Sequence, residues 1–216
     1  MGLVICVEGL IGQGKTTLVE KLNGTKYLEP VESNPFLEDY YSDPKRWAYA
    51  MQVNLLSERF AMFQRAQWET WNAQDTEHDA ILDRSFYGDW AFAEVQRDLG
   101  YMTDKEFDSY KRLHRVHQHF LQFPDLILRL DCPIETTMSR IEERARGCET
   151  GISQDYIQRL SDAYDTLFEE LERKTCVVRL DATKSPSEVL ADAIAAIKWR
   201  RSLNVGNQYP HYNGGH

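Results

Sequence analysis

The chain has 216 residues, of which 42% are hydrophobic, so it is long and apolar enough for one domain with a sizeable core and too apolar for a disordered chain. Its 25 basic and 34 acidic residues give a net charge of −9, and we expect no nucleic-acid partner because an acidic domain repels a phosphate backbone. No apolar run approaches the roughly 20 residues of a membrane helix, and the four cysteines form no CxxC pair, so we expect a cytoplasmic protein with reduced thiols and no membrane contact.

Apolar runs alternate with helical patterns along the chain. Strands are predicted at residues 3–8, 80–83, 126–130 and 176–180. Helices are predicted at residues 15–22, 44–72 and from 132 onward. This alternation predicts an α/β fold, in which a central parallel sheet of about five strands has helices on both faces. We expect this domain over residues 1–201 and an irregular tail over residues 202–216.

The first predicted strand runs into a glycine-rich segment that matches the phosphate-loop pattern G-x-x-x-x-G-K-[ST] in full. A helix is predicted directly after it, as this pattern requires. The glycines let backbone N–H groups turn toward phosphate oxygens, and the start of the helix adds partial positive charge. We expect the segment to bind ATP through these residues: Gly9, Leu10, Ile11, Gly12, Gln13, Gly14, Lys15, Thr16 and Thr17. Lys15 should bridge the outer phosphates, and Thr16 should ligate Mg²⁺.

A second metal ligand is expected at the end of a neighbouring strand. Asp83 follows the apolar run 80–82. A carboxylate at this place can hold Mg²⁺ directly or through water. The alternative is that Asp83 only caps a following helix, a position that aspartate favours.

Two polar side chains interrupt the apolar face of the long helix predicted at residues 44–72. Gln52 and Arg59 share one stripe with Leu56 and Phe63. They are two turns apart, about 10 Å along the axis, which suits gripping opposite parts of one flat ligand. The alternative is that Arg59 lies at the rim of the face and extends its charge into water.

Three arginines lie near the end of the helix that starts at residue 132. Arg140 and Arg144 are four residues apart, Arg146 follows, and Gly147 is expected to end the helix. Such a cluster suits a lid that neutralises the charge of a transferring phosphoryl group. The alternative is a solvated face on which the arginines pair with neighbouring glutamates.

Together these motifs resemble the deoxynucleoside kinase family, especially its deoxyadenosine and deoxyguanosine kinase branch. The resemblance extends from Leu3 to about Arg200. Besides the phosphate loop and the pair Gln52 and Arg59, it rests on residues 28–31 (LEPV), 34–38 (NPFLE), 83–85 (DRS) and 140–149. It implies a P-loop kinase fold with a helical lid, and a homodimer packed through long helices.

The resemblance also implies roles for single residues around the sugar of the substrate. Glu29 matches the general base that accepts the proton of the 5′-hydroxyl, and Arg84 matches the residue that orients Glu29 and the incoming phosphoryl group. Tyr41 and Glu149 match the pair that holds the 3′-hydroxyl. The three arginines of the predicted lid match the lid arginines of the family.

Other matches surround the base of the substrate. Gln52 matches the residue that hydrogen-bonds the base edge, and Arg59 with Asp89 matches the charged pair that further fixes the base. Two positions depart from the family pattern. Asp83 stands where many members have glutamate, and Ala93, with Phe92 beside it, stands where the family often has a base-stacking phenylalanine.

The predicted function is therefore phosphorylation of the 5′-hydroxyl of a deoxynucleoside, a small molecule, with ATP and Mg²⁺ and with deoxyadenosine or deoxyguanosine preferred. A deoxycytidine or broad-specificity kinase is an alternative. A kinase of nucleoside monophosphates is disfavoured because Glu29 would repel a phosphate at the 5′ position. A nucleotide-binding switch without enzymatic activity is disfavoured because it needs neither base-binding residues nor lid arginines.

Overall fold

The computed structural model describes residues 2–29, 34–73, 78–144 and 152–203. Within these ranges, the strands form one parallel sheet in the order β2-β3-β1-β4-β5. Their bounds are β1 Val4–Glu8, β2 Thr25–Tyr27, β3 Ala80–Asp83, β4 Leu126–Asp131 and β5 Val177–Asp181. The predicted parallel sheet is confirmed, and the four predicted strands are present within one residue at each end. The short strand β2 was not predicted, because only one of its three residues is buried.

Strand β1 lies in the middle of the sheet and is buried along its whole length. It pairs with β3, Val4 opposite Ala80, and with β4, Ile5 opposite Leu126. Because the strands are parallel, their carboxyl ends meet at one edge of the sheet. The polar residues that follow β1, β2 and β3 therefore come together at that edge.

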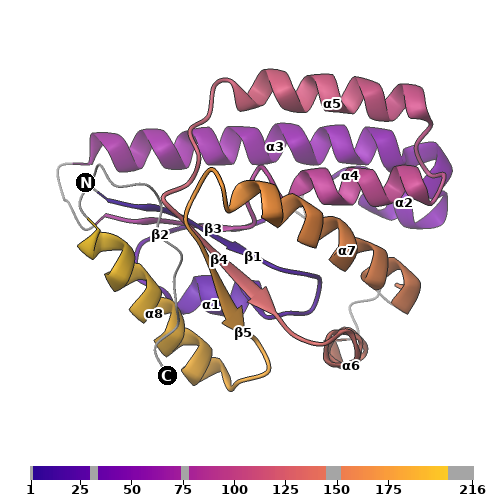
Figure 1. The fold of residues 1–216 in the computed structure, drawn as a ribbon. Coiled ribbons are helices and arrows are strands. Elements are labelled where there is room, and N and C mark those ends of the chain that lie inside the picture. The colour runs from indigo at the N-terminus through magenta and orange to yellow at the C-terminus, as the bar shows by residue number, and fades with distance from the viewer. Residues whose placement is uncertain (1, 30–33, 74–77, 145–151, 204–216) are drawn as a thin grey trace.

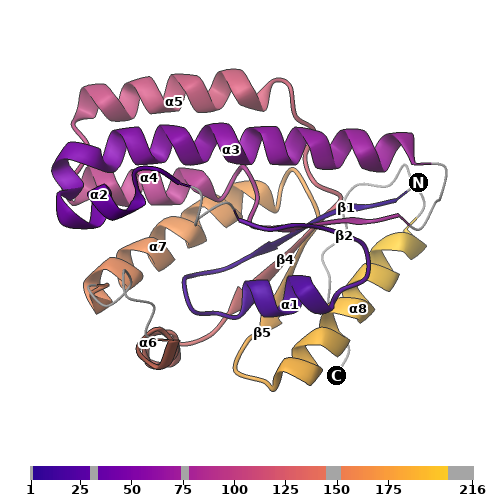
Figure 2. The ribbon, with the colours of Figure 1, turned by 180° about the vertical axis from the view of Figure 1, so that it is seen from behind.

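Helices cover both faces of the sheet (Figures 1 and 2). On one face lie α1 (Lys15–Lys21) and α8 (Pro186–Ser202), which pack against each other. On the other face lie α3 (Pro44–Asn72), α4 (Asp89–Asp98) and α7 (Gln154–Leu171). The remaining helices are α2 (Leu37–Ser42), which packs on α3, α5 (Asp104–Gln118), which lies outside α3 and α4, and α6 (Ile134–Arg144), which follows β4.

Helix α3 has the bounds that the sequence predicts. Asp43 caps its first turn by accepting a hydrogen bond from the amide of Arg46, and Pro44 occupies a first-turn position where no amide donor is needed. Its buried face contains Gln52 and Arg59 among apolar side chains. Since buried polar groups need partners, this face must contribute to a polar network.

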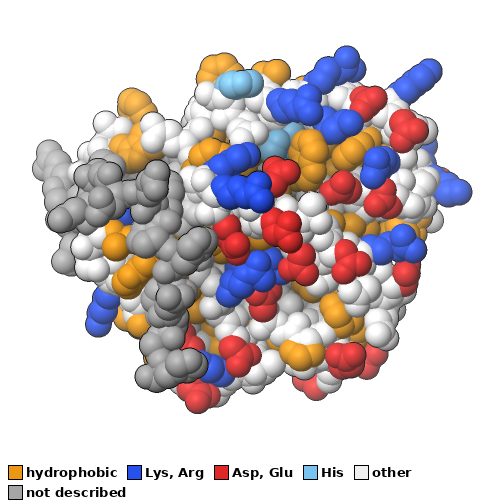
Figure 3. Space-filling model, in the orientation of Figure 1, with side chains coloured by type: hydrophobic (Ala, Val, Ile, Leu, Met, Phe, Trp, Pro, Cys, Tyr) orange, Lys and Arg blue, Asp and Glu red, His pale blue; other side chains and the backbone are white. Residues whose placement is uncertain are grey.

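Acidic and basic side chains are interspersed over the face of the molecule shown in Figure 3. None of the helices in the described ranges has the length and apolarity that crossing a membrane requires.

Candidate active site

The phosphate loop connects β1 to α1 at the carboxyl edge of the sheet. Gly9, Gly12 and Gly14 have φ angles of 148°, 80° and 88°, which residues with a Cβ rarely adopt. At Gly9 a Cβ would also stand 2.8 Å from the carbonyl oxygen of Leu130. Gly14 precedes α1 without a side-chain cap, so the first amides of the helix remain available to an anion.

Lys15 and Thr16 begin α1 and point back toward the loop and the neighbouring strand. The buried ammonium group of Lys15 donates to the carbonyl oxygen of Leu10 at 2.7 Å. Burial, together with the charge of Arg84, lowers the pKa of Lys15 to about 8. Thr16 donates its hydroxyl to Oδ2 of Asp83 at 2.5 Å, so the two predicted metal ligands lie together.

Asp83 ends β3 and is buried. Its Oδ1 atom is enclosed and has no hydrogen-bond partner. A hydroxyl and a carboxylate with a free oxygen are the hard ligands that Mg²⁺ prefers, so these residues fit the ion. The alternative that Asp83 caps a helix is wrong, since the next helix, α4, begins at Asp89 after the cap residue Gly88.

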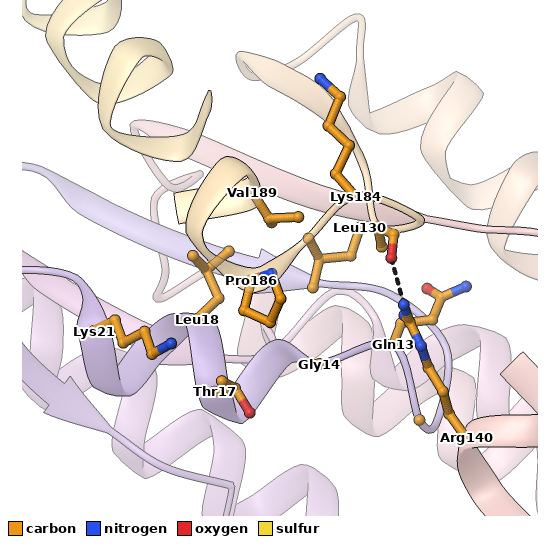
Figure 4. Close-up of a pocket in the computed structure, with 12 residues that line it drawn as sticks. Gln13, Gly14, Thr17, Leu18, Lys21, Leu130, Arg140, Lys184, Pro186 and Val189 are labelled. Atoms are coloured by element: carbon orange, nitrogen blue, oxygen red, sulfur yellow. Dashed lines mark hydrogen bonds between the residues drawn. The ribbon is translucent and has the colours of Figure 1, made fainter. Parts of the chain in front are cut away.

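A cavity of about 210 Å³ opens beside the phosphate loop (Figure 4). Gly12 and Gln13 of the loop and Thr17 of α1 line it, together with Lys184, which lies between β5 and α8, and Pro186, the first residue of α8. Its remaining lining residues are Gly14, Leu18, Lys21, Leu130, Arg140, Ala182 and Val189. The cavity thus lies between the phosphate loop and the start of α8.

Arg140 of α6 lies at this cavity. Its guanidinium group donates to the carbonyl oxygen of Ala182 at 2.8 Å (Figure 4), so it does not belong to a freely solvated face of α6. The side chain of Arg144, the whole of Arg146 and Glu149 lie outside the described residues. The predicted lid is therefore described only at its beginning.

Glu29 follows β2 and contacts Arg84, which follows β3, and Arg59, which lies on α3. Its carboxylate accepts a hydrogen bond from Nε of Arg84 at 3.1 Å and forms an ion pair with Arg59. Burial opposes the negative charge, but Arg84, Arg59 and Lys15 outweigh burial and hold the pKa of Glu29 at about 2. The carboxylate is therefore ionised and available as a hydrogen-bond acceptor at neutral pH.

Gln52 and Arg59 of α3 meet Asp89 at the start of α4. Nε2 of Gln52 donates to Oδ1 of Asp89 at 2.9 Å, and Arg59 forms an ion pair with the same carboxylate. Arg59 exposes only 2% of its surface, so the alternative that it lies at a solvated rim is wrong. Arg59 thus connects Asp89 to Glu29.

Two further residues complete this network and were not predicted. The hydroxyl of Tyr110, on α5, donates to Oδ2 of Asp89 at 3.0 Å. Nε2 of Gln96, on α4, donates to Oε1 of Gln52 at 3.2 Å. Gln96 lies seven residues after Asp89, the same spacing that identified Gln52 and Arg59, so periodicity could have indicated it. Tyr110 lies on the buried face of α5 with Phe107 and His114, and nothing in its sequence spacing points to Asp89.

Tyr41 lies on α2, and 39% of its surface is exposed. Its ring contacts Tyr40 edge-on, with the ring centres 5.4 Å apart. Since Glu149 lies outside the described residues, the pairing of Tyr41 with Glu149 stays a prediction.

A sequence model of the family described as deoxynucleoside kinase matches residues 5–197. The chain belongs to the deoxynucleoside kinase family. This kinase is 34% identical to the deoxyadenosine kinase of Dictyostelium discoideum over 219 residues, which cover 99% of the chain and 86% of that relative. It is 32% identical to a deoxyguanosine kinase of Lactobacillus acidophilus over 182 residues, which cover 78% and 76% of the two chains.

A solved structure agrees with this assignment. The structure of deoxyadenosine kinase from M. mycoides, with the products dCMP and a flexible dCDP bound, superposes with a TM-score of 0.79 at 25% identity. The match covers 91% of this kinase and 100% of that chain. The resemblance read from the motifs and the P-loop kinase fold are thereby confirmed.

Proposed function

We propose that this kinase transfers the terminal phosphoryl group of ATP to the 5′-hydroxyl of a deoxynucleoside, and that it prefers deoxyadenosine or deoxyguanosine. The carboxylate of Glu29 supports this proposal most directly. Arg84 and Arg59 hold it between the phosphate loop and the network of Gln52, Arg59 and Asp89. A 5′-hydroxyl would lie between phosphate and base in the same way.

In the proposed reaction, Glu29 accepts the proton of the 5′-hydroxyl, and Arg84 orients Glu29 and the incoming phosphoryl group. Lys15, already buried at the loop, compensates the negative charge of the outer phosphates. Thr16 and Asp83 would hold Mg²⁺, which supplies further compensation of phosphate charge. The protein contributes chiefly position and electrostatics, because phosphoryl transfer needs little covalent help.

The cavity beside the phosphate loop would take the base of the phosphate donor. It lies next to Gly12 and Gln13, and Arg140 borders it. We propose that Arg140, with Arg144 and Arg146, closes over the donor phosphates as a lid. A guanidinium group held at the cavity wall by the carbonyl oxygen of Ala182 supports this placement for Arg140.

The preference for deoxypurines rests on the groups that would meet the base. Asp89 is an acceptor, which suits a base that carries an amino group better than thymine, whose carbonyl oxygen would meet it unpaired. Ala93 is small where a ring would narrow the pocket. The names of the relatives from D. discoideum and L. acidophilus support purines. Cytosine also carries an amino group, and the M. mycoides relative binds dCMP, so deoxycytidine is the second candidate.

We also propose a homodimer and a cytoplasmic location. Exposed apolar side chains lie on α3 (Trp68 and Trp71), on α5 (Val116) and just after α5 (Phe120), and the two helices pack together. Such a surface fits a second copy of the chain packed through these helices.

Tyr41, paired with Glu149, is proposed to hold the 3′-hydroxyl of the deoxynucleoside.

One panel of assays tests the substrate. Labelled ATP is supplied with each of the four natural deoxynucleosides and with thymidylate, and kcat/KM is measured for each acceptor. We expect a deoxypurine nucleoside to give the highest value and thymidine to be roughly 5- to 150-fold lower, since an unpaired buried acceptor costs about 1–3 kcal/mol. Thymidine as the best acceptor would contradict the base preference, and thymidylate as the best acceptor would contradict the reaction.

A further inference from the structure

Arg84 has an unusual backbone. Its φ angle is 70°, which the other non-glycine residues of the described ranges avoid. A residue with a Cβ keeps this conformation only when surrounding contacts hold it. Its amide donates to the carbonyl oxygen of Val7 at 3.0 Å, but the turn that follows needs further support.

Glu8, the last residue of β1, supplies that support. It is fully buried, and its Oε1 accepts two hydrogen bonds from Ser85, from the amide at 2.7 Å and from the hydroxyl at 2.6 Å. The Ser85 hydroxyl in turn accepts from the amides of Tyr87 and Gly88, each at 3.1 Å. A Cβ at Gly88 would overlap the Glu8 carboxylate, so the turn is shaped around this side chain.

The second oxygen of Glu8 forms a long ion pair with Nη1 of Arg84, at 3.9 Å, and is joined to the same atom by the shorter hydrogen bonds of Tyr164 of α7. The Tyr164 hydroxyl donates to Oε2 of Glu8 at 3.1 Å and accepts from Nη1 of Arg84 at 2.7 Å. The same Nη1 donates to the carbonyl oxygen of Gly9 at 2.8 Å, at the start of the phosphate loop. Burial raises the pKa of Tyr164, so its hydroxyl keeps the proton that this arrangement requires.

We infer that Glu8 is a positioning residue for phosphoryl transfer, acting on the backbone of Arg84 through Ser85 and on its guanidinium group through Tyr164. The inference rests on the proposed function, in which Arg84 orients Glu29 and the phosphoryl group. Glu8 itself does not touch the reacting atoms. It fixes both ends of Arg84, so that Nε of Arg84 meets the Glu29 carboxylate.

A purely structural role for Glu8 and Tyr164 would be to tie α7 to the sheet. Another contact already does this: Arg129 of β4 forms an ion pair with Asp165 of α7 at 2.5 Å. Asp165 follows Tyr164 directly but touches β4 instead of Arg84. The two contacts therefore allow the positioning role to be separated from the attachment of α7.

The experiment compares Tyr164→Phe and Glu8→Gln with Asp165→Asn, each in the wild-type and in the Arg84→Ala background. kcat, KM for the nucleoside and Tm are measured for every variant. In the wild-type background, we expect Tyr164→Phe and Glu8→Gln to lower kcat about 10- to 100-fold while KM changes less than about twofold. A misplaced Arg84 would stabilise the transition state less well but would change substrate binding little. Asp165→Asn should keep kcat within about twofold.

The Arg84→Ala background decides between positioning and general damage. There we expect Tyr164→Phe to lower kcat by less than about twofold further, since the group that Tyr164 holds is already absent. An unchanged kcat for Tyr164→Phe in the wild-type background, or an equal loss in both backgrounds, would overturn the inference. If Glu8→Gln does not fold, Tyr164→Phe alone decides. A normal kcat for Arg84→Ala alone would instead contradict the proposed role of Arg84.

Discussion

The candidate site has a phosphate end, formed by the phosphate loop with Lys15 and Thr16, and a base end, formed by the residues around Asp89 that the proposed function assigns to the base. The two ends are built from different parts of the chain. At the phosphate end, consecutive residues present backbone amides, and the side chains of Lys15 and Thr16 add one charge and one hydroxyl. At the base end, side chains from α3, α4 and α5 converge on Asp89, which accepts from Gln52, Arg59 and Tyr110. In the proposed function, the first arrangement would bind a group common to every nucleotide, whereas the second would distinguish one base from another.

The two ends meet at Glu29. Arg84, Arg59 and Lys15 all lower the pKa of Glu29, so cations from both ends act on its carboxylate. Substitutions at the two ends should therefore change different kinetic constants. Single substitutions and a pH titration can show whether the phosphate end and the base end act independently.

Lys15→Ala should have the largest effect. Removal of the buried cation from the transferring phosphates is expected to lower kcat about 10³-fold, as loss of a transition-state donor does elsewhere. Binding of deoxyadenosine, measured by calorimetry, should persist because the base end is intact. Lys26→Ala, at an exposed lysine of β2, is the control. Equal loss of nucleoside binding would mean that the two ends are not separable.

Glu29→Gln should lower kcat about 10²-fold, because the amide cannot accept the proton of the hydroxyl. The nucleoside dissociation constant should change little, since both ends remain in place. The matched control is Glu38→Gln on the exposed side of α2. Near-normal turnover of Glu29→Gln would remove Glu29 from the mechanism.

Asp89→Ala should act on selectivity rather than on chemistry. The ratio of kcat/KM for deoxyadenosine over thymidine is expected to fall by roughly 5- to 150-fold, because in the wild type the carbonyl oxygen of thymine would face the Asp89 carboxylate without a donor. Asp98→Ala, at the exposed end of the same helix, controls for damage to α4. An unchanged ratio would leave the preference standing but remove Asp89 as its cause.

The pH dependence of ATP binding tests the phosphate end alone. Because the pKa of Lys15 is lowered to about 8, the ammonium group is charged below that pH and has lost its proton above it. Binding of phosphates requires the charged form, so ATP affinity should be constant well below pH 8, begin to fall near it, and fall by up to about tenfold per unit as pH rises further. Calorimetry in buffers of different ionisation enthalpy should detect proton uptake. Lys15→Ala should bind ATP without this uptake, and uptake that persists would contradict the assignment.

Gln96→Leu should have the smallest effect. It removes one neutral hydrogen bond to Gln52, about 1 kcal/mol, so KM for the preferred nucleoside should rise about 3- to 10-fold while kcat stays near normal. Gln158→Leu, on the exposed side of α7, is the control. A loss in kcat instead of KM would show that the base end also controls the chemistry.

The same contrast explains what could be predicted from the sequence. The phosphate loop was identified in full because its residues are consecutive and their φ angles require glycine. Gln52 and Arg59 could be identified because they lie two turns apart on the same face of one predicted helix. The contacts of Tyr110 and Gln96 arise only when α3, α4 and α5 pack together, and no local pattern reports that packing.

The strands also differ in how well the sequence predicts them. Strands β1 and β4 are buried and mostly apolar, and they are predicted nearly to the residue. Strand β2 is short and mostly polar, and it is a strand because β3 lies beside it. Glu8 was not recognised because a carboxylate at the end of an apolar run is typical of a solvated strand end. Its burial depends on Ser85 and Tyr164, which come much later in the chain.

The central place of β1 also governs how the protein can form during synthesis. The strand is made before the other described strands, and its neighbours β3 and β4 follow only after α3 and α5, respectively, have been made. Until β3 and β4 have been made, both edges of the apolar strand β1 lack their native partners. Pairing β1 with these strands also brings together residues that are far apart in the sequence, which is slow. We therefore expect this kinase to fold late in translation and to be prone to aggregation when its synthesis stops before β4.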